Sequence, residues 1–353
     1  WKLFSENQEC IKDICMVTGE SKPIAIIHPK RIRNSGDGGK LISSNDKTNF
    51  TFLGRFLLNK IILNNKEEKI AVQAASISSE ISQKAHSALR WLIDRQSFRN
   101  GDQVIVSWAV SGKQIPNAIS DSNSFFNETD EEKIQEIFQI PVSDAGQTFA
   151  RKLSKKIAGY KESLGETNNI IVMGLDSAGP GRISITFYRE LQKNEFLDRI
   201  ESWFNQMAWY FHEYYEQKGN KKIPIQGNRP FVPSPRAIAE ACYGKRLDDK
   251  LKKSTIERLL PCIIDGRQVP VDLVDSIVKR ASNKTGIDHW EWERTLSVAC
   301  SLFRCYSIRN SNQYKIEYSM ALEKERTDRD YLYGRLLAVG CPRIALSLEE
   351  PAL

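Results

Sequence analysis

Signals for helix boundaries dominate the chain from Ser234 onward, and they restrict its fold more than any other feature of the sequence. Ser234 followed by Pro235 is typical of a helix N-terminus, and Gly244 is typical of the end of that helix. Three later helix signals follow: a capping box at Ser254 and Glu257, an apolar stripe over Val271–Val278, and a second stripe over Trp290–Tyr306. The last third of the chain is therefore predicted to be a helical region.

Strand and helix patterns alternate before residue 234. Short β-branched runs predict strands at Ile24–Ile27, Val104–Val110 and Ile170–Met173, and inward alternation of Ile183, Ile185 and Phe187 predicts the second strand of a hairpin that turns at Asp176–Gly181. Helical spacing predicts helices over Ile77–Leu92 and Phe196–Phe211. These patterns indicate an α+β fold with a mixed N-terminal region, a β-hairpin plus helix middle region and a helical C-terminal region.

A polar stretch over residues 111–133 has no apolar period and is typical of a long loop or an inter-domain linker. The predicted organisation is a mixed α/β region at 1–133, a β-hairpin and helix region at 134–233, and a helical region at 234–353, with an atypical tail from Gly340.

The charge of the chain favours a polyanionic partner. Its 51 Lys and Arg residues outnumber its 44 Asp and Glu residues, for a formal net charge of +7. Neutralised phosphates release counterions, which favours nucleic-acid binding by basic proteins, although many basic proteins bind no nucleic acid.

Basic residues gather in two segments. Glycine-rich residues 29–49 carry Lys30, Arg31, Arg33 and Lys40 around Gly36, Gly38 and Gly39. Glycines let a backbone approach phosphates closely, and an ordinary solvent loop explains the same composition. The second cluster consists of Lys245, Arg246, Lys250, Lys252 and Lys253 between two predicted helices, where a solvated helix junction is the simpler interpretation.

Motifs of catalysis are missing from the sequence. It has no GxSxG, Walker loop, HExxH or kinase set, and Leu41 follows Lys40 where a phosphate loop requires a hydroxyl. Asp46 with Glu67 and Lys69 is the nearest approach to a metal-dependent nuclease, although solvated charge explains these residues better. We expect neither an enzyme nor a cofactor.

The seven cysteines do not form a disulfide or zinc pattern. Cys10/Cys15 and Cys300/Cys305 are the close pairs, and Cys10/Cys15 has no second pair of matching spacing to complete a zinc site. Thiols in a reducing, cytoplasmic compartment are expected, and no apolar run is long enough to span a membrane.

Several stretches, taken in order, resemble one family. They are Cys15–Glu20, Ile27–Lys30, Gly39–Asn45, Ser76–Ser78 with Ala88–Leu89, Gly181–Ile185, Tyr243–Lys245, Glu291–Arg294 and Thr327–Leu337. Over roughly residues 10–339 the chain looks like the large subunit of the type I-C CRISPR Cascade complex. In that family a longer region precedes the Val17–Glu20 motif, and the tail from Gly340 departs from the family pattern.

The resemblance implies a non-catalytic subunit of a crRNA-guided surveillance complex. Such a subunit contacts double-stranded target DNA near the protospacer-adjacent motif, supports R-loop formation and helps recruit a helicase-nuclease, beside backbone and small subunits. A metal-dependent nuclease and a free-standing RNA-binding protein remain the alternatives.

The loop over Arg33–Asn45 is then expected to lie against target DNA, with Lys40 and Asn45 as leading contacts. Asn45 can donate and accept at a base edge, and Ser43 and Ser44 can contact phosphates. The resemblance also adds Arg182 to the nucleic-acid-binding residues.

Overall fold

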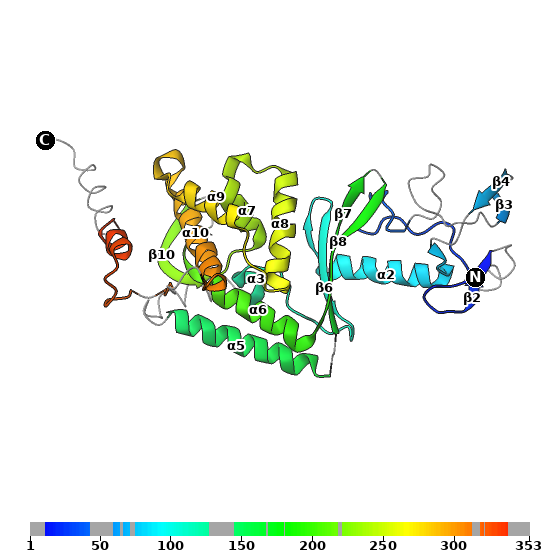
Figure 1. The fold of residues 1–353 in the computed structure, drawn as a ribbon, viewed down its shortest axis with the longest axis horizontal. Helices are drawn as coiled ribbons and strands as arrows, with labels where there is room; N and C mark the ends of the chain where they lie inside the picture. Colours follow the sequence, from blue (N-terminus) through cyan, green and yellow to red (C-terminus); the bar gives the residue numbers. More distant parts are fainter. Residues whose placement is uncertain are drawn as a thin grey trace.

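A four-stranded antiparallel sheet lies at the centre of the molecule (Figure 1). This computed structural model describes residues 11–42, 59–63, 66–70, 75–126, 145–166, 169–179, 181–217, 221–312, 318–320 and 322–337. The sheet has the order β5-β6-β7-β8, with β5 at Phe98–Asn100, β6 at Gln103–Ala109, β7 at Asn169–Gly179 and β8 at Arg182–Gln192.

Strand β6 of this sheet is buried on both faces. Successive side chains of a strand point to opposite faces, and in β6 Val104 and Val106 pack toward helix α2 (Ser79–Gln96). Ile105 and Ala109 belong to a larger core built with the helices on the other face. Figure 1 shows α2 on one side of the sheet and α6 and α8 on the other. Burial on both faces therefore explains why the apolar run of β6 is continuous and does not alternate with polar residues.

A β-bulge moves the side chains of β8 from one face to the other. Gly174 pairs with Phe187 and Leu175 pairs with Ile185, so Thr186 has no partner in the ladder. Before the bulge Ile183 packs with the α2 side, whereas after it Phe187 packs with the larger core. The predicted hairpin is present, but Ile183, Ile185 and Phe187 do not all face inward on one side, as expected. The extra residue Thr186 breaks the period of two and turns Phe187 to the other face, and Ile185, on the face of Ile183, is 49% exposed.

The middle of the chain ends in a second hairpin that the sequence did not predict. Helix α5 (Ala145–Leu164) packs on α6 (Lys193–Met207), and strands β9 (Trp209–Gln217) and β10 (Lys221–Phe231) follow. The predicted helix therefore stops at Met207, and Phe211 belongs to β9. The aromatic-rich run from Trp209 favours a strand over a further helical turn.

The C-terminal region is helical, as predicted. It contains α7 (Pro235–Tyr243), the 3₁₀ turn η2 (Gly244–Arg246), α8 (Asp249–Ile264), α9 (Val271–Ala281), the 3₁₀ turn η3 (Lys284–Gly286) and α10 (His289–Arg309). Ser234 caps α7 by accepting a hydrogen bond from the amide of Ala237 at 3.3 Å, and Gly244 ends it with φ at +54°. The predicted capping box at Ser254 is wrong, because Asp248 caps α8 six residues earlier by accepting from the amide of Leu251 at 2.6 Å.

The N-terminal region is made of small hairpins. Strands β1 (Lys12–Ile14) and β2 (Ser21–Pro23) pair, as do β3 (Asn59–Leu63) and β4 (Lys66–Ile70). The predicted strand at Ile24–Ile27 does not form, because the amide of Ala25 donates to the carbonyl of Ile77 just before α2 and Ile24 makes an isolated bridge to Ser78. The short helix α3 (Ser122–Phe126) packs its Phe125 into the larger core.

The α+β class is confirmed by this arrangement. The division near residue 133 remains a prediction, and the central sheet joins segments from both sides of it through the pairing of β6 with β7. The described helices include none with the length and hydropathy that a membrane span requires.

The Phe204→Ala substitution tests the larger core. Phe204 is fully buried, and its ring lies 4.6 Å from that of Phe125. We expect a loss of about 3–5 kcal/mol in the free energy of unfolding, measured as a lower urea midpoint at unchanged slope. Val271→Ala, at a position that is 53% exposed, is the control and should cost about 0.5 kcal/mol or less. Equal shifts for the two variants would contradict this description of the core.

Candidate nucleic-acid interface

Two isolated β-bridges place three basic residues in adjacent positions. Lys30 pairs with Lys40 in an antiparallel bridge, and Lys40 pairs with Arg182 in a parallel one. The amide of Lys40 donates to the carbonyl of Gly181 at 3.0 Å, and the amide of Ile183 donates to the carbonyl of Lys40 at 3.0 Å. Lys40 thereby extends the edge of β8.

Pairing places these three cations side by side. Residues directly opposite each other in a ladder present their side chains to the same face, with Cβ atoms about 5 Å apart. We call Lys30, Lys40 and Arg182 the three-cation row. Burial, followed by the charge of Lys30, lowers the pKa of the Lys40 ammonium. Like charges opposite each other repel, and the charge of Lys30 disfavours the protonated form of Lys40 accordingly.

Apolar anchors fix the loop that carries Lys30 and Lys40. Ile32 is 1% exposed and belongs to the core between α2 and the sheet, and Leu41 packs against the same core. These two anchors hold the loop at both ends, and Lys30 and Lys40 lie next to them.

Arg33 supports this loop from inside the protein. Its Nε donates to Asp37 Oδ2 at 2.8 Å and its Nη2 donates to Asp37 Oδ1 at 3.0 Å, while both side chains are 5% exposed. Its Nη1 donates to the carbonyl of Asp102 at 2.8 Å and to Ser177 Oγ at 3.0 Å. The guanidinium holds the pKa of the Asp37 carboxyl below its ordinary value. Arg33, predicted to bind nucleic acid, thus binds the loop to the sheet.

Two further arginines, which sequence reasoning missed, hold the loop by its carbonyl groups. Arg90 on α2 donates to the carbonyls of Lys30 and Arg31, the latter at 3.0 Å, and Arg99 on β5 donates to the carbonyl of Arg33 at 2.8 Å. The backbone of Arg31 is in the left-handed region with φ at 60°. No local pattern marks Arg90 or Arg99, because each acts on a residue 59 or more positions away.

A pocket of about 400 Å³ opens beside the row. Glycines form a large part of its lining, and Asn34, Asp102, Ser177 and Arg182 also line it. A Cβ on Gly38 would meet nothing within 4 Å, whereas one on Gly39 would lie 2.9 Å from Ile183 Cγ1. Gly38 therefore leaves open backbone at the surface, and Gly39 is required by packing on β8.

The positive charge of this surface comes from its lysines and arginines. His28 is 1% exposed and its Nδ1 lies 2.8 Å from Ser82 Oγ. Burial, with smaller contributions from His86 and Lys40, lowers the pKa of His28 to about 4. His28 is accordingly neutral at physiological pH.

The second basic cluster divides into two kinds of residue. Lys245 and Arg246 in η2 and Lys250 on α8 are exposed. Lys252 is paired with Asp249 at 3.2 Å, and Lys253 with Asp176 of β7 at 3.2 Å. Lys253 therefore ties α8 to the central sheet.

Several other predicted residues cannot be placed as a site from the described residues. Ser43, Ser44, Asn45, Asp46 and Cys10 lie outside the described residues. Glu67 and Lys69 belong to β4, of which only the backbone is described. Cys15 is buried, and its Sγ accepts a hydrogen bond from the amide of Ser78 at 3.3 Å. Among the described residues, no group of three or more His, Cys, Asp or Glu side chains is placed to hold a metal ion.

Comparison with known families gives one match that covers nearly the whole chain. The family described as CRISPR-associated protein (Cas_Csd1) matches residues 1–341. No curated protein matches the chain.

The Asp37→Asn substitution tests the internal support of the loop. Removing one charge of a buried pair should lower the free energy of unfolding by about 3–5 kcal/mol at neutral pH. Because the folded pKa of Asp37 is lowered, this stabilisation is present above the ordinary value of 3.8 and is lost as the pH falls through the folded pKa. Urea unfolding over a pH series should therefore show the parent and the variant converging in acid.

Asp94→Asn is the matched control for this test. Asp94 pairs with Arg99 at 2.6 Å but is 73% exposed, so its loss should cost about 1 kcal/mol or less. A parent and an Asp37→Asn variant that differ by the same amount at every pH would exclude the ion pair as the source of the stability.

Proposed function

The chain belongs to the Cas_Csd1 family, the large subunit of the type I-C CRISPR Cascade complex, and from this premise we propose how it serves that complex. It contacts double-stranded target DNA near the protospacer-adjacent motif, supports R-loop formation and helps recruit a separate helicase-nuclease. Its partners in this proposal are crRNA, target DNA, the backbone and small subunits, and the helicase-nuclease.

The three-cation row is the observation that carries the proposed DNA contact. Duplex DNA presents one negative charge per roughly 1.7 Å of its axis, so a fixed row of cations can neutralise several neighbouring phosphates. Lys30 and Lys40 are held in register by backbone pairing, and Arg182 is held beside them. Such a surface loses less backbone freedom on binding than a mobile basic tail does.

The same loop is suited to recognising a short DNA sequence motif. In a guide-directed complex, base pairing supplies most of the sequence specificity, and by analogy with single-protein effectors the protein reads a short motif and holds the backbone. Gly38 leaves open backbone beside the row, and Asn45 offers an amide that can donate and accept at a base edge. We assign Lys40 to phosphate contact and Asn45 to motif reading. Lys245, Arg246 and Lys250 are further candidates for contact with nucleic-acid backbone.

The proposed role is non-catalytic, and this part of the proposal rests on family membership. Phosphodiester hydrolysis needs grouped carboxylates or another assembled acid and base. The charged groups beside the proposed interface are instead committed to holding the loop, as in the pairing of Arg33 with Asp37. The support of R-loops and the recruitment of the helicase-nuclease rest on family membership.

Lys40→Ala and Asn45→Ala should have different effects on the assembled complex. Lys40→Ala should weaken binding to correct and mutated motifs by the same factor and reduce the slope of log affinity against log salt by about 0.9. Asn45→Ala should instead reduce discrimination between the two duplexes by about 1 kcal/mol. The measurement is the affinity of the complex for both duplexes over a salt series.

Lys84→Ala is the matched control, since it removes the same charge from an exposed position on α2 where Lys84 pairs with Glu80. It should bind both duplexes like the parent. If Lys40→Ala and Asn45→Ala also behave like the parent, the loop does not contact target DNA.

A cleavage assay separates this proposal from the nuclease alternative. The purified complex, incubated with target DNA and magnesium but without the helicase-nuclease, should leave the DNA intact. Magnesium-dependent cleavage that disappears on Glu67→Ala would favour a nuclease. Tight, salt-resistant binding of RNA by the isolated chain would favour a free-standing RNA-binding protein.

A further inference from the structure

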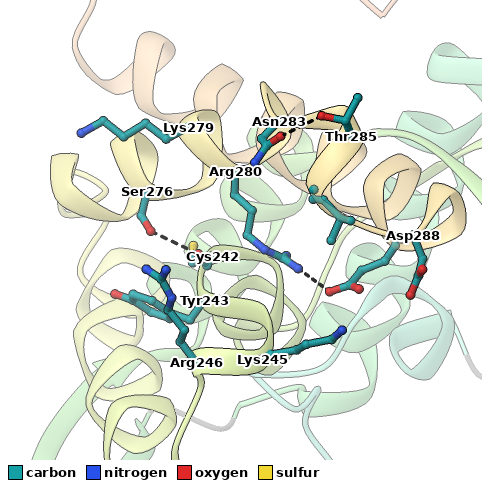
Figure 2. A pocket seen from close by; sticks show the side chains of 13 residues that line it. Cys242, Tyr243, Lys245, Arg246, Ser276, Lys279, Arg280, Asn283, Thr285 and Asp288 are labelled. Atoms are coloured by element: carbon teal, nitrogen blue, oxygen red, sulfur yellow. Dashed lines mark hydrogen bonds and ion pairs between the residues drawn. The ribbon is translucent and has the colours of Figure 1, made fainter.

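A second and larger cavity lies within the C-terminal helices. Its volume is about 680 Å³, and it lies among the end of α7, η2, α9 and the start of α10 (Figure 2). Cavities that bind organic ligands have volumes of roughly 300–1,000 Å³ and combine apolar walls with a few placed polar groups. Tyr243 and Ile287 supply apolar surface here, and Ser276 and Thr285 supply hydroxyl groups.

The floor of this cavity is rigid. Arg280 donates through Nη1 to the carbonyl of Ala241 at 2.9 Å and to Thr295 Oγ1 at 3.1 Å, and its Nη2 pairs with Glu291. A Cβ on Gly244 would lie 2.4 Å from Arg280 Nη2, and the positive φ of Gly244 also disfavours any side chain. The tight packing of Arg280 on Gly244 therefore joins η2, α9 and α10 into one wall.

Three cations around the cavity have no acidic partner within the described ranges. They are Lys245 and Arg246 of η2 and Lys279 of α9, and all three are exposed. Cations of the neighbouring helices are neutralised, as Arg258 of α8 is by Asp272 and Arg236 of α7 by Glu240. Fixed, unneutralised cations around a concave surface attract an anion, because the low-dielectric walls focus their field.

Acceptors for hydrogen bonds come from the start of α10. Figure 2 shows Asp288 beside the carboxylate that pairs with Arg280, on the opposite side of the cavity from Ser276. The Asp288 side chain makes no capping hydrogen bond to its own helix, so its oxygens are available to a ligand donor. Carboxylates accept hydrogen bonds from the exocyclic amino group of cytosine, which thymine lacks.

We propose that this cavity takes one unpaired nucleotide of a single-stranded nucleic acid, with its phosphate at Lys245 and Arg246 and its base inside, where the amino edge meets Asp288. The inference rests on the proposed function, because it assumes that nucleic acid reaches this face of the protein. It adds a site for a single strand that is separate from the three-cation row.

The test uses the full chain and short fluorescent single strands, with binding measured by anisotropy. The probes are an oligodeoxycytidine, an oligodeoxythymidine, an abasic strand of equal length and an oligoribocytidine. The parent should bind oligodeoxycytidine about tenfold more tightly than the abasic strand and several-fold more tightly than oligodeoxythymidine. Tighter binding of oligodeoxycytidine identifies displaced DNA as the source of the bound nucleotide. Tighter binding of oligoribocytidine identifies guide RNA as that source.

Two variants assign the contacts to this cavity. Lys245→Ala/Arg246→Ala should weaken binding of all strands by about tenfold, and Asp288→Asn should remove the preference for cytosine while leaving the affinity for the abasic strand unchanged. Lys84→Ala/Lys155→Ala is the charge-matched control at two exposed lysines outside the cavity, and it should bind with smaller losses. All substituted positions are exposed, and circular dichroism checks that each variant is folded.

Equal binding of the abasic strand and oligodeoxycytidine by the parent would overturn the proposal, even if Lys245→Ala/Arg246→Ala weakens both, because the cavity would then hold no base. That result leaves the proposed function intact, since the latter is tested on duplex DNA through Lys40. If Lys40→Ala does not weaken binding of duplex DNA while the parent still prefers oligodeoxycytidine to the abasic strand, the proposed function is wrong and the base site in the cavity stands.

Discussion

Burial of strand β6 on both faces of the central sheet is the constraint on which the rest of the molecule depends. Val104 and Val106 on one face and Ile105 and Ala109 on the other leave β6 almost no exposed surface. A two-stranded hairpin is marginal in water, whereas a sheet packed between two layers is stable. The α2 layer carries the loop with Lys30 and Lys40, and the helical layer carries the cavity beside Gly244. Both proposed surfaces thus depend on one scaffold.

The proposed interface has a buried layer of paired opposite charges and a surface layer of adjacent like charges. Inside, Arg33 and Asp37 satisfy each other, and the remaining donors of Arg33 reach carbonyl and hydroxyl oxygens. At the surface, Lys30, Lys40 and Arg182 stand in adjacent positions of two isolated β-bridges. A buried ion pair is costly unless its hydrogen bonds are complete, and here they are extensive enough to fix the backbone that holds like charges together. The fold therefore holds these three cations in adjacent positions.

The sequence predicted those features that depend on local signals. The cap at Ser234, the end at Gly244 and the strands around Ile170 and Ile183 follow from residues within a few positions of one another. The bulge at Thr186 and the break after Met207 were missed, because tertiary pairing sets both of them. The basic loop was recognised by composition. Its contact with Arg182, its support by Arg90 and Arg99, and the inward position of Arg33 require contacts across many residues that no periodicity encodes.

The bulge in β8 has a geometric consequence. A strand whose first half packs in one layer at Ile183 and whose second half packs in the other at Leu191 cannot let the layers swing apart without breaking its ladder with β7. Such a strand opposes a hinge motion between the two layers. The sheet therefore resists changes in the distance between the three-cation row and the cavity beside Gly244. A nucleic acid that touches both must bend or stretch to match the protein, so the work of deformation falls on the polynucleotide.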